Sequence, residues 1–178
     1  MGVDTTLYKI VLWLHILSAI VGLGTVFLNG VYAQFAKDRP GPGGLAISEA
    51  VQHLAYNWAE WFIYLVFVFG VVLIPLSDGA IGFDEVWVSL SMGLFILALV
   101  ISHGLHKPNL KKMLALQREL VGMGPPPGAA SAGEATGPKG PPPQAVELEE
   151  RGKRAAAYGA SLNLLVLVIL GLMVWKPA

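Results

Sequence analysis

Four long apolar segments, almost free of charged residues, dominate this chain of 178 residues. A helix needs roughly 20 mainly apolar residues to cross the hydrocarbon core of a membrane. The segments, each about that long, are 7–32, 58–76, 86–105 and 155–175. We therefore predict an all-α fold, a four-helix transmembrane bundle that forms a single domain in the lipid bilayer.

Charge and cysteine content exclude several classes of function. Charged residues make up only 13% of the chain and the formal net charge is zero, so no basic surface is expected for nucleic acid. The absence of cysteine rules out disulfides, iron–sulfur clusters, thiolate metal sites and cysteine nucleophiles. The sequence also contains no phosphate-binding glycine loop, nucleophile elbow or HExxH motif.

The basic residues indicate an orientation in the membrane. Of the 12 Lys and Arg residues, ten lie in the connection that follows the first segment or in the connection between the third and fourth segments. If each segment crosses the membrane once, these two connections lie on the same side of it. The positive-inside rule makes that side cytoplasmic, so both termini are expected to be extracytoplasmic. Together with the high Gly, Ala and Pro content, this predicts a multi-pass protein of the inner cell membrane of a bacterium.

The connection between the third and fourth segments has three predicted parts. Pro108 is expected to interrupt or kink the end of the third helix. Residues 109–121 then have the pattern of an amphipathic helix lying on the cytoplasmic membrane surface. Residues 122–145, rich in Gly, Pro and Ala, are typical of a disordered linker. The fourth helix is expected to begin near residue 147, since acid–base pairs at i,i+4 precede its apolar part.

Polar and small residues recur on one face of each predicted helix. The spacings of three and four residues place together His15, Ser18, Gly22, Thr25 and Asn29; His53, Asn57, Glu60 and Tyr64; Ser89, Gly93 and His103; and Gly159 and Asn163. In lipid such faces turn inward, because small residues let helices approach and polar groups need partners. Ser18 and Gly22, like Ser89 and Gly93, are explained by helix packing alone. The three asparagines Asn29, Asn57 and Asn163 are explained by interhelical hydrogen bonds.

The ionisable residues inside the segments are the candidate site residues. A buried Glu60 must be protonated, hydrated or paired, with His53, His103 or Lys107 as the structural partners and a proton or ligand role as the alternative. Nitrogen and oxygen ligands for iron, copper or zinc are offered by His53, Glu60, His103 and His106. The alternative is that two of these histidines are simply solvated near the interface.

A short stretch carries a family resemblance. Residues 12–19 (LWLHILSA), followed by Gly22 and Gly24, resemble the opening of a bacterial family of integral membrane proteins of unknown function. The four-helix layout and the region of His103 are also similar to HemJ-type protoporphyrinogen oxidases and CopD-type copper-resistance proteins. The resemblance implies that His15 and His103 match histidines associated with haem or metal binding. The two histidines differ in their depth in the membrane by more than about 10 Å. We therefore expect them to belong to different sites, or only one of them to be a ligand.

Three function hypotheses follow. The first is a membrane redox protein that binds haem b or a metal ion, with His15 and His103 as ligands and Glu60 as a proton carrier or ligand partner. The second is a non-catalytic subunit or scaffold, a homo-oligomer or part of a membrane complex, whose basic surface binds a partner or anionic lipid. The third is a small proton-coupled transporter centred on Glu60.

Overall fold

The computed structural model describes residues 2–124 and 140–177, and all regular structure in these ranges is helical. The helices form four long rods. The first is α1 (Thr6–Lys37) and the fourth is α6 (Pro143–Trp175). The second rod joins α2 (Pro42–Leu54), the π-helical turn η1 (Ala55–Ala59) and α3 (Glu60–Leu76); the third joins α4 (Val86–Ile101), the π-helical turn η2 (Ser102–His106) and α5 (Lys107–Gly122). Each rod is long and apolar enough to cross a membrane.

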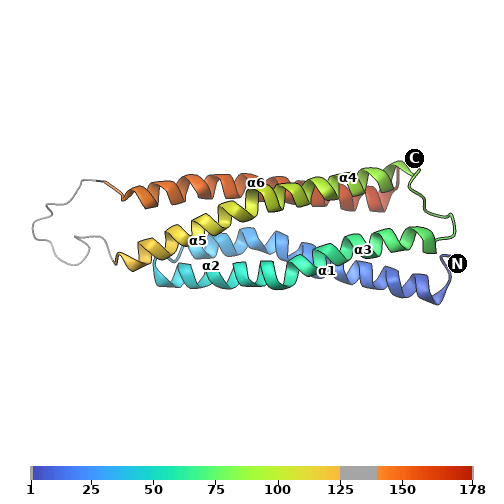
Figure 1. Ribbon diagram of the computed structural model, residues 1–178, viewed down its shortest axis with the longest axis horizontal. Coiled ribbons are helices and arrows are strands. Elements are labelled where there is room, and N and C mark those ends of the chain that lie inside the picture. The colour runs from blue at the N-terminus through green and yellow to red at the C-terminus, as the bar shows by residue number, and fades with distance from the viewer. Residues whose placement is uncertain (1, 125–139, 178) are drawn as a thin grey trace, which may run out of the picture.

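The rods lie side by side, with both termini at one end of the bundle (Figure 1). We call this the termini end and the opposite end the polar end. Along the bundle, α1 packs against α2 and α3, while α6 packs against α4 and α5. The structure thus contains two helix pairs, which meet between α1 and α6, between α2 and α5, and through side chains between α3 and α4.

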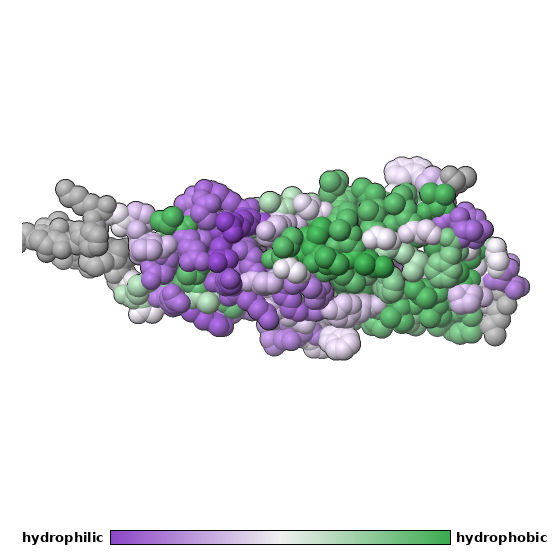
Figure 2. All heavy atoms as spheres, turned by 45° about the horizontal axis from the view of Figure 1, so that its top comes forward, coloured by the Kyte–Doolittle hydropathy of each residue, from purple (hydrophilic) through white to green (hydrophobic). Residues whose placement is uncertain are grey.

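Only part of each rod is suited to lipid. A rod of 32 to 37 residues measures about 50 Å, whereas a hydrocarbon core is about 30 Å thick. Figure 2 shows hydrophobic residues gathered over the half at the termini end and hydrophilic residues over the half at the polar end. In the hydrophobic half, large apolar side chains such as Ile20 and Leu164 point outward and are more than half exposed, as lipid-facing residues should be.

The helices extend beyond their predicted bounds. The second rod begins at Pro42 rather than at residue 58, because Gly41, at φ +84°, turns the chain and Pro42 suits the first helical turn. Residues 109–121 are helical, but they continue α4 along the bundle instead of forming a separate surface helix (Figure 1). The fourth helix begins at Pro143 rather than near residue 147. Most of the predicted linker, residues 125–139, lies outside the described residues.

The contact between α1 and α3 is close where the small residues of α1 lie. Ser18 and Gly22 are both buried, and a Cβ atom on Gly22 would lie 3.0 Å from the backbone nitrogen of Ile63. The predicted packing role of this pair agrees with that contact. Ser89 and Gly93 differ: Ser89 is exposed and a Cβ atom on Gly93 would meet nothing within 4 Å, so this face of α4 is not a close contact within the chain.

The interior of the bundle is only partly filled. One apolar cluster, Tyr8, Val11 and Leu73, joins α1 to α3 near the termini end. A second, Val66, Phe95 and Ile169, joins α3, α4 and α6. A cavity of about 2410 Å³ runs along the bundle, with lining residues from Tyr8 and Lys176 at one end to Met123 and Pro142 at the other. A typical ligand pocket measures roughly 300–1,000 Å³.

Candidate functional site

His15 is held by the backbone of the neighbouring helix. Its Nδ1 donates a hydrogen bond of 2.8 Å to the carbonyl oxygen of Val66, which lies on α3. The residue is 9% exposed and lines the cavity. The second ring nitrogen, Nε2, makes no hydrogen bond within the part of the chain that the structure describes. The ring is therefore fixed in one tautomer, with the lone pair on Nε2.

Gly70 makes room for this ring. It lies one turn after Val66 on α3, and a Cβ atom there would come within 3.2 Å of His15 Cε1 and 3.6 Å of Nδ1. A larger residue would push the imidazole off the carbonyl of Val66. No sequence pattern indicated this pairing, because Gly70 lies in an otherwise uniform apolar run.

Glu60 is the centre of a second polar cluster, between α3 and the third rod. Its Oε1 accepts hydrogen bonds from Tyr64 OH at 2.7 Å and from the Lys107 ammonium at 3.0 Å, and Oε2 accepts a second bond from Lys107 at 2.7 Å. Nε2 of His103 lies 2.9 Å from Oε1 and 2.8 Å from the Tyr64 oxygen. The side chains of Glu60 and Lys107 are 19% and 25% exposed. We name Glu60, Tyr64, His103 and Lys107 the junction cluster.

Both rods that meet at the junction cluster change their helical pitch there. Glu60 directly follows η1 and its N–H donates to the carbonyl of Ala55; Lys107 directly follows η2 and its N–H donates to the carbonyl of Ser102. Such single-turn π-helices are rare and often lie at functional sites. In the third rod the turn also directly precedes the start of α5, where Pro108 lies in the first helical turn. Proline has no N–H to donate, and the rod nevertheless stays helical through it.

The other predicted residues are dispersed. His53 is exposed and accepts a hydrogen bond from Asn57 at 2.9 Å; Asn57 is exposed too. Asn29 and Asn163 are half-buried and line the cavity. His106 also lines it, edge-on to the ring of Tyr158. Of the proposed inner metal ligands, the structure thus brings together only Glu60 and His103.

The histidines differ in their capacity to bind a cofactor. Nδ1 of His103 donates to the carbonyl of Leu99 at 3.0 Å, and Nε2 contacts Glu60 and Tyr64, so both of its nitrogens are engaged. Within residues 2–124 and 140–177, no three His, Asp or Glu side chains are arranged to hold one metal ion. His15, by contrast, keeps Nε2 without a hydrogen bond among the described residues, and Nδ1 of His106 likewise has no hydrogen-bond partner there.

Two polar residues of the interior were missed by the sequence analysis. Tyr56, in η1, and Ser91, on α4, both line the cavity, and neither hydroxyl has a hydrogen-bond partner among the described residues. Ser91 is 4% exposed. Tyr56 precedes the apolar run, and serine is common in spanning helices, so neither stood out from the sequence.

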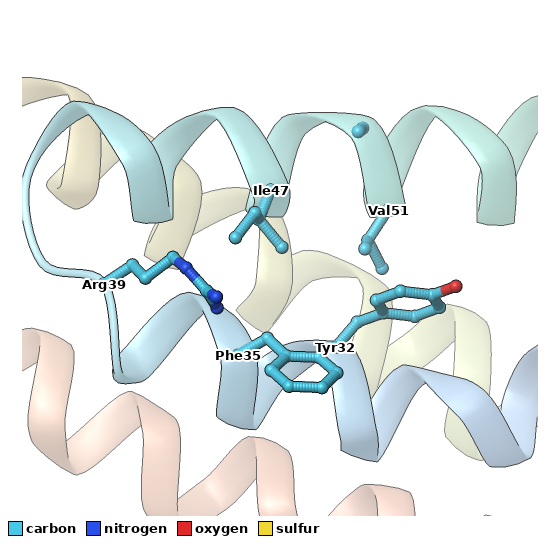
Figure 3. Close-up of a pocket in the computed structure, with 6 residues that line it drawn as sticks. Tyr32, Phe35, Arg39, Ile47 and Val51 are labelled. Atoms are coloured by element: carbon cyan, nitrogen blue, oxygen red, sulfur yellow. The ribbon is translucent and has the colours of Figure 1, made fainter.

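A separate crevice of about 350 Å³ lies on the outer surface of the polar half, between α1 and α2. Figure 3 shows Tyr32 and Phe35 of α1 facing Ile47 and Val51 of α2, with the guanidinium of Arg39 reaching into the space between the helices. The Arg39 guanidinium carbon lies 5.7 Å from the centre of the Phe35 ring. The crevice thus offers an apolar surface with one cation.

Comparison with protein-family models, with curated proteins and with solved structures gives no match for this chain.

Proposed function

We propose that this four-helix membrane protein binds haem b through His15 and takes part in electron transfer within the membrane. The observation that carries the proposal is the hydrogen bond of 2.8 Å from His15 Nδ1 to the carbonyl of Val66. Histidines that ligate metals almost always donate their other ring N–H to a carbonyl or carboxylate, which fixes the tautomer and raises the basicity of the ligating nitrogen. His15 has this arrangement in the wall of a large cavity.

The surroundings of His15 fit a large planar group. The cavity exceeds an ordinary ligand pocket several-fold, and its lining is mainly apolar, including Phe95, Val166 and Ile169. Bound haem would supply a one-electron redox centre whose potential depends on its axial ligand and on the polarity of the site. The chain contributes the orientation of the imidazole, through Val66, and the space for its ring, through Gly70.

A single axial histidine is expected. Counted at about 1.5 Å per residue from the helix ends at the termini end, His15 lies about 14 Å deep and His103 about 26 Å deep. One haem cannot bridge two ligands so far apart in depth. Because the nitrogens of His103 are also engaged, the proposal assigns the cofactor to His15 alone.

The test is the visible spectrum of the purified protein, oxidised and dithionite-reduced, from cells supplied with ample haem. We expect a Soret band and b-type bands on reduction, lost in His15→Ala. His103→Ala should keep them, as should the matched control His53→Ala, since His53 is exposed and, among the residues that the structure describes, bonds only to Asn57. A flat spectrum in the unmodified protein, together with an absence of stoichiometric iron, would refute the proposal.

The crevice between α1 and α2 favours a second candidate, a subunit that binds a protein partner or a further copy of this chain. Tyr32 and Phe35 are 40% and 47% exposed there. A photo-cross-linking residue at Phe35 should then give a discrete product of higher mass in native membranes. The same residue at Leu164, which lies on the lipid-facing surface, is the control. Equal products at both positions would indicate random collision.

A further inference from the structure

Several polar atoms in the wall of the cavity are buried without a partner. Within the described parts of the chain they are Asn163 Oδ1, His106 Nδ1, Tyr56 OH and Ser91 Oγ. A buried polar group without a hydrogen bond costs about 1–3 kcal/mol. Water enters cavities that are roomy and offer polar partners, whereas apolar cavities stay dry. These atoms are therefore the places in the cavity wall where a water molecule would find a hydrogen-bond partner.

The polar groups are spaced along the cavity at regular depths. Counted at about 1.5 Å per residue from the termini end, His15, Asn163 and Glu60 lie about 14, 18 and 24 Å deep, and His106 and Tyr56 about 30 Å. Neighbouring levels are thus about 4–6 Å apart. Since hydrogen-bonded oxygens are about 2.8 Å apart, one or two water molecules could span such a difference in depth.

The apolar cluster of Val66, Phe95 and Ile169 ends this series. Counted in the same way, its residues lie about 9–15 Å deep, beside His15, whose Nδ1 bonds to Val66 itself. The cluster joins α3, α4 and α6, and the Phe67 ring stacks on Phe95 at 5.5 Å. On its other side, toward the termini, the one buried side-chain atom without a hydrogen-bond partner among the described residues is Ser91 Oγ.

We infer that the cavity between the polar end and this cluster is a water-filled half-channel that carries protons to the level of His15. The junction cluster lies along it and offers polar groups that can hydrogen-bond to its water: the carboxylate of Glu60, the imidazole of His103 and the phenol of Tyr64. Ionisable groups on the interior of a membrane bundle commonly mark such proton relays. The cavity continues past the apolar cluster toward Tyr8 and Lys176, and in our proposal the apolar side chains of the cluster keep water, and with it the proton path, from continuing there. The inference does not depend on a bound cofactor.

The absence of cysteine allows a direct test of the water. Single cysteines replace Asn163 and Ala156, which line the cavity, and Leu164, which is 63% exposed and does not line it. The proteins, in lipid nanodiscs, react with a small water-soluble methanethiosulfonate reagent. Because only a hydrated thiolate reacts, Asn163→Cys and Ala156→Cys should react about tenfold faster than Leu164→Cys, or more. Equal rates for Asn163→Cys and its neighbour Leu164→Cys would overturn the half-channel.

Proton movement is tested by opening the apolar cluster. In liposomes that contain a pH-sensitive dye, with a potassium diffusion potential, Phe95→Ala should raise proton flux about tenfold, equal to about 1.4 kcal/mol off the barrier. Ile169→Ala opens the same cluster from α6 and covers the case in which Phe95→Ala does not fold. Adding Asn163→Leu should abolish the gain. Phe27→Ala, outside the cavity, is the control.

Two results would overturn proton conduction: unchanged flux in both open-cluster variants, or a gain that Asn163→Leu leaves intact. The visible spectrum, by contrast, decides only the haem proposal. A flat spectrum with fast labelling of Asn163→Cys would remove the haem and leave the half-channel in place.

Discussion

The Lys107 ammonium donates two hydrogen bonds to the Glu60 carboxylate, at 3.0 and 2.7 Å, and so joins the second rod to the third. These residues stand 47 positions apart in the sequence. Each directly follows a π-helical turn, so the ion pair connects the two places where the rods are irregular. We regard this pair as the contact that fixes the position of the second rod along the length of the third.

Removing one partner of this pair should be costly. Lys107→Met leaves the Glu60 carboxylate without its cation, and we expect a loss of about 1–3 kcal/mol of stability; a fully buried pair would lose more, about 3–5 kcal/mol. At about 2–4 °C per kcal/mol for a chain of this size, the thermal midpoint in detergent should fall measurably.

Adding Glu60→Gln to Lys107→Met should recover part of the lost stability, because no unpaired charge remains. Arg118→Met, which breaks the exposed pair with Glu49, should change stability by less than about 1 kcal/mol. An additive double variant would show that the two residues are not coupled.

Gly22 and Gly24 should respond in opposite directions to alanine. In a helix interior alanine is favoured over glycine by about 1 kcal/mol, so Gly24→Ala, with nothing within 4 Å of the new Cβ, should stabilise the protein slightly. Gly22→Ala places its Cβ 3.0 Å from the backbone nitrogen of Ile63, which no side-chain movement can relieve. We expect it to lower the thermal midpoint as α1 and α3 separate. Equal midpoints for both variants would contradict the close contact.

Gly70→Ala should disturb His15 without removing it. The new Cβ would lie 3.2 Å from His15 Cε1, so the ring must shift from the carbonyl of Val66. If His15 ligates haem, the Soret band should shift or weaken while the protein still elutes as a folded species. Gly93→Ala, with no atom within 4 Å of its Cβ, is the matched control and should leave the spectrum unchanged. A spectrum that responds alike to both would place the cofactor elsewhere.

Asn109 should be important for the polar half of the bundle. It is 7% exposed, its amide donates to the carbonyl of Arg151 at 2.9 Å, and its Oδ1 accepts from the Arg151 guanidinium at 3.3 Å. Asn109→Leu removes both of these bonds to α6, although the Arg151 guanidinium keeps its ion pair with Glu147, and we expect a cost of about 1–3 kcal/mol. Hydrogen exchange should then increase in α5 and in the first turns of α6, with little change near Val66. Uniform protection in α5 would show that apolar packing, rather than Asn109, joins the two helices.

The sequence by itself determined that the helices of this protein are suited to lipid, and how many long helical rods there are. A run of about 20 apolar residues is stable as a helix in lipid. Lipid offers no hydrogen-bond partners, and a helix pairs every backbone group within the segment. Four such runs therefore predicted four helices that are each able to span a membrane, and the structure confirms them. The periodicity of α1 also predicted that His15, Ser18 and Gly22 share a buried face.

The tertiary structure decided which residues meet. His15 and the carbonyl of Val66 are 51 positions apart, and their contact depends on the rotation and depth of two rods, which no local pattern encodes. Ser89 and Gly93 show the limit clearly. They repeat the spacing of Ser18 and Gly22, yet Ser89 is exposed and no neighbouring helix of the described residues comes within 4 Å of a Cβ atom on Gly93. Residues 42–57 lie outside the predicted span because they are not uniformly apolar; they extend the rod because α1 and α5 pack against them. Local hydropathy specifies a helix in lipid, but the partner of each inward residue is chosen by the packing of all four rods.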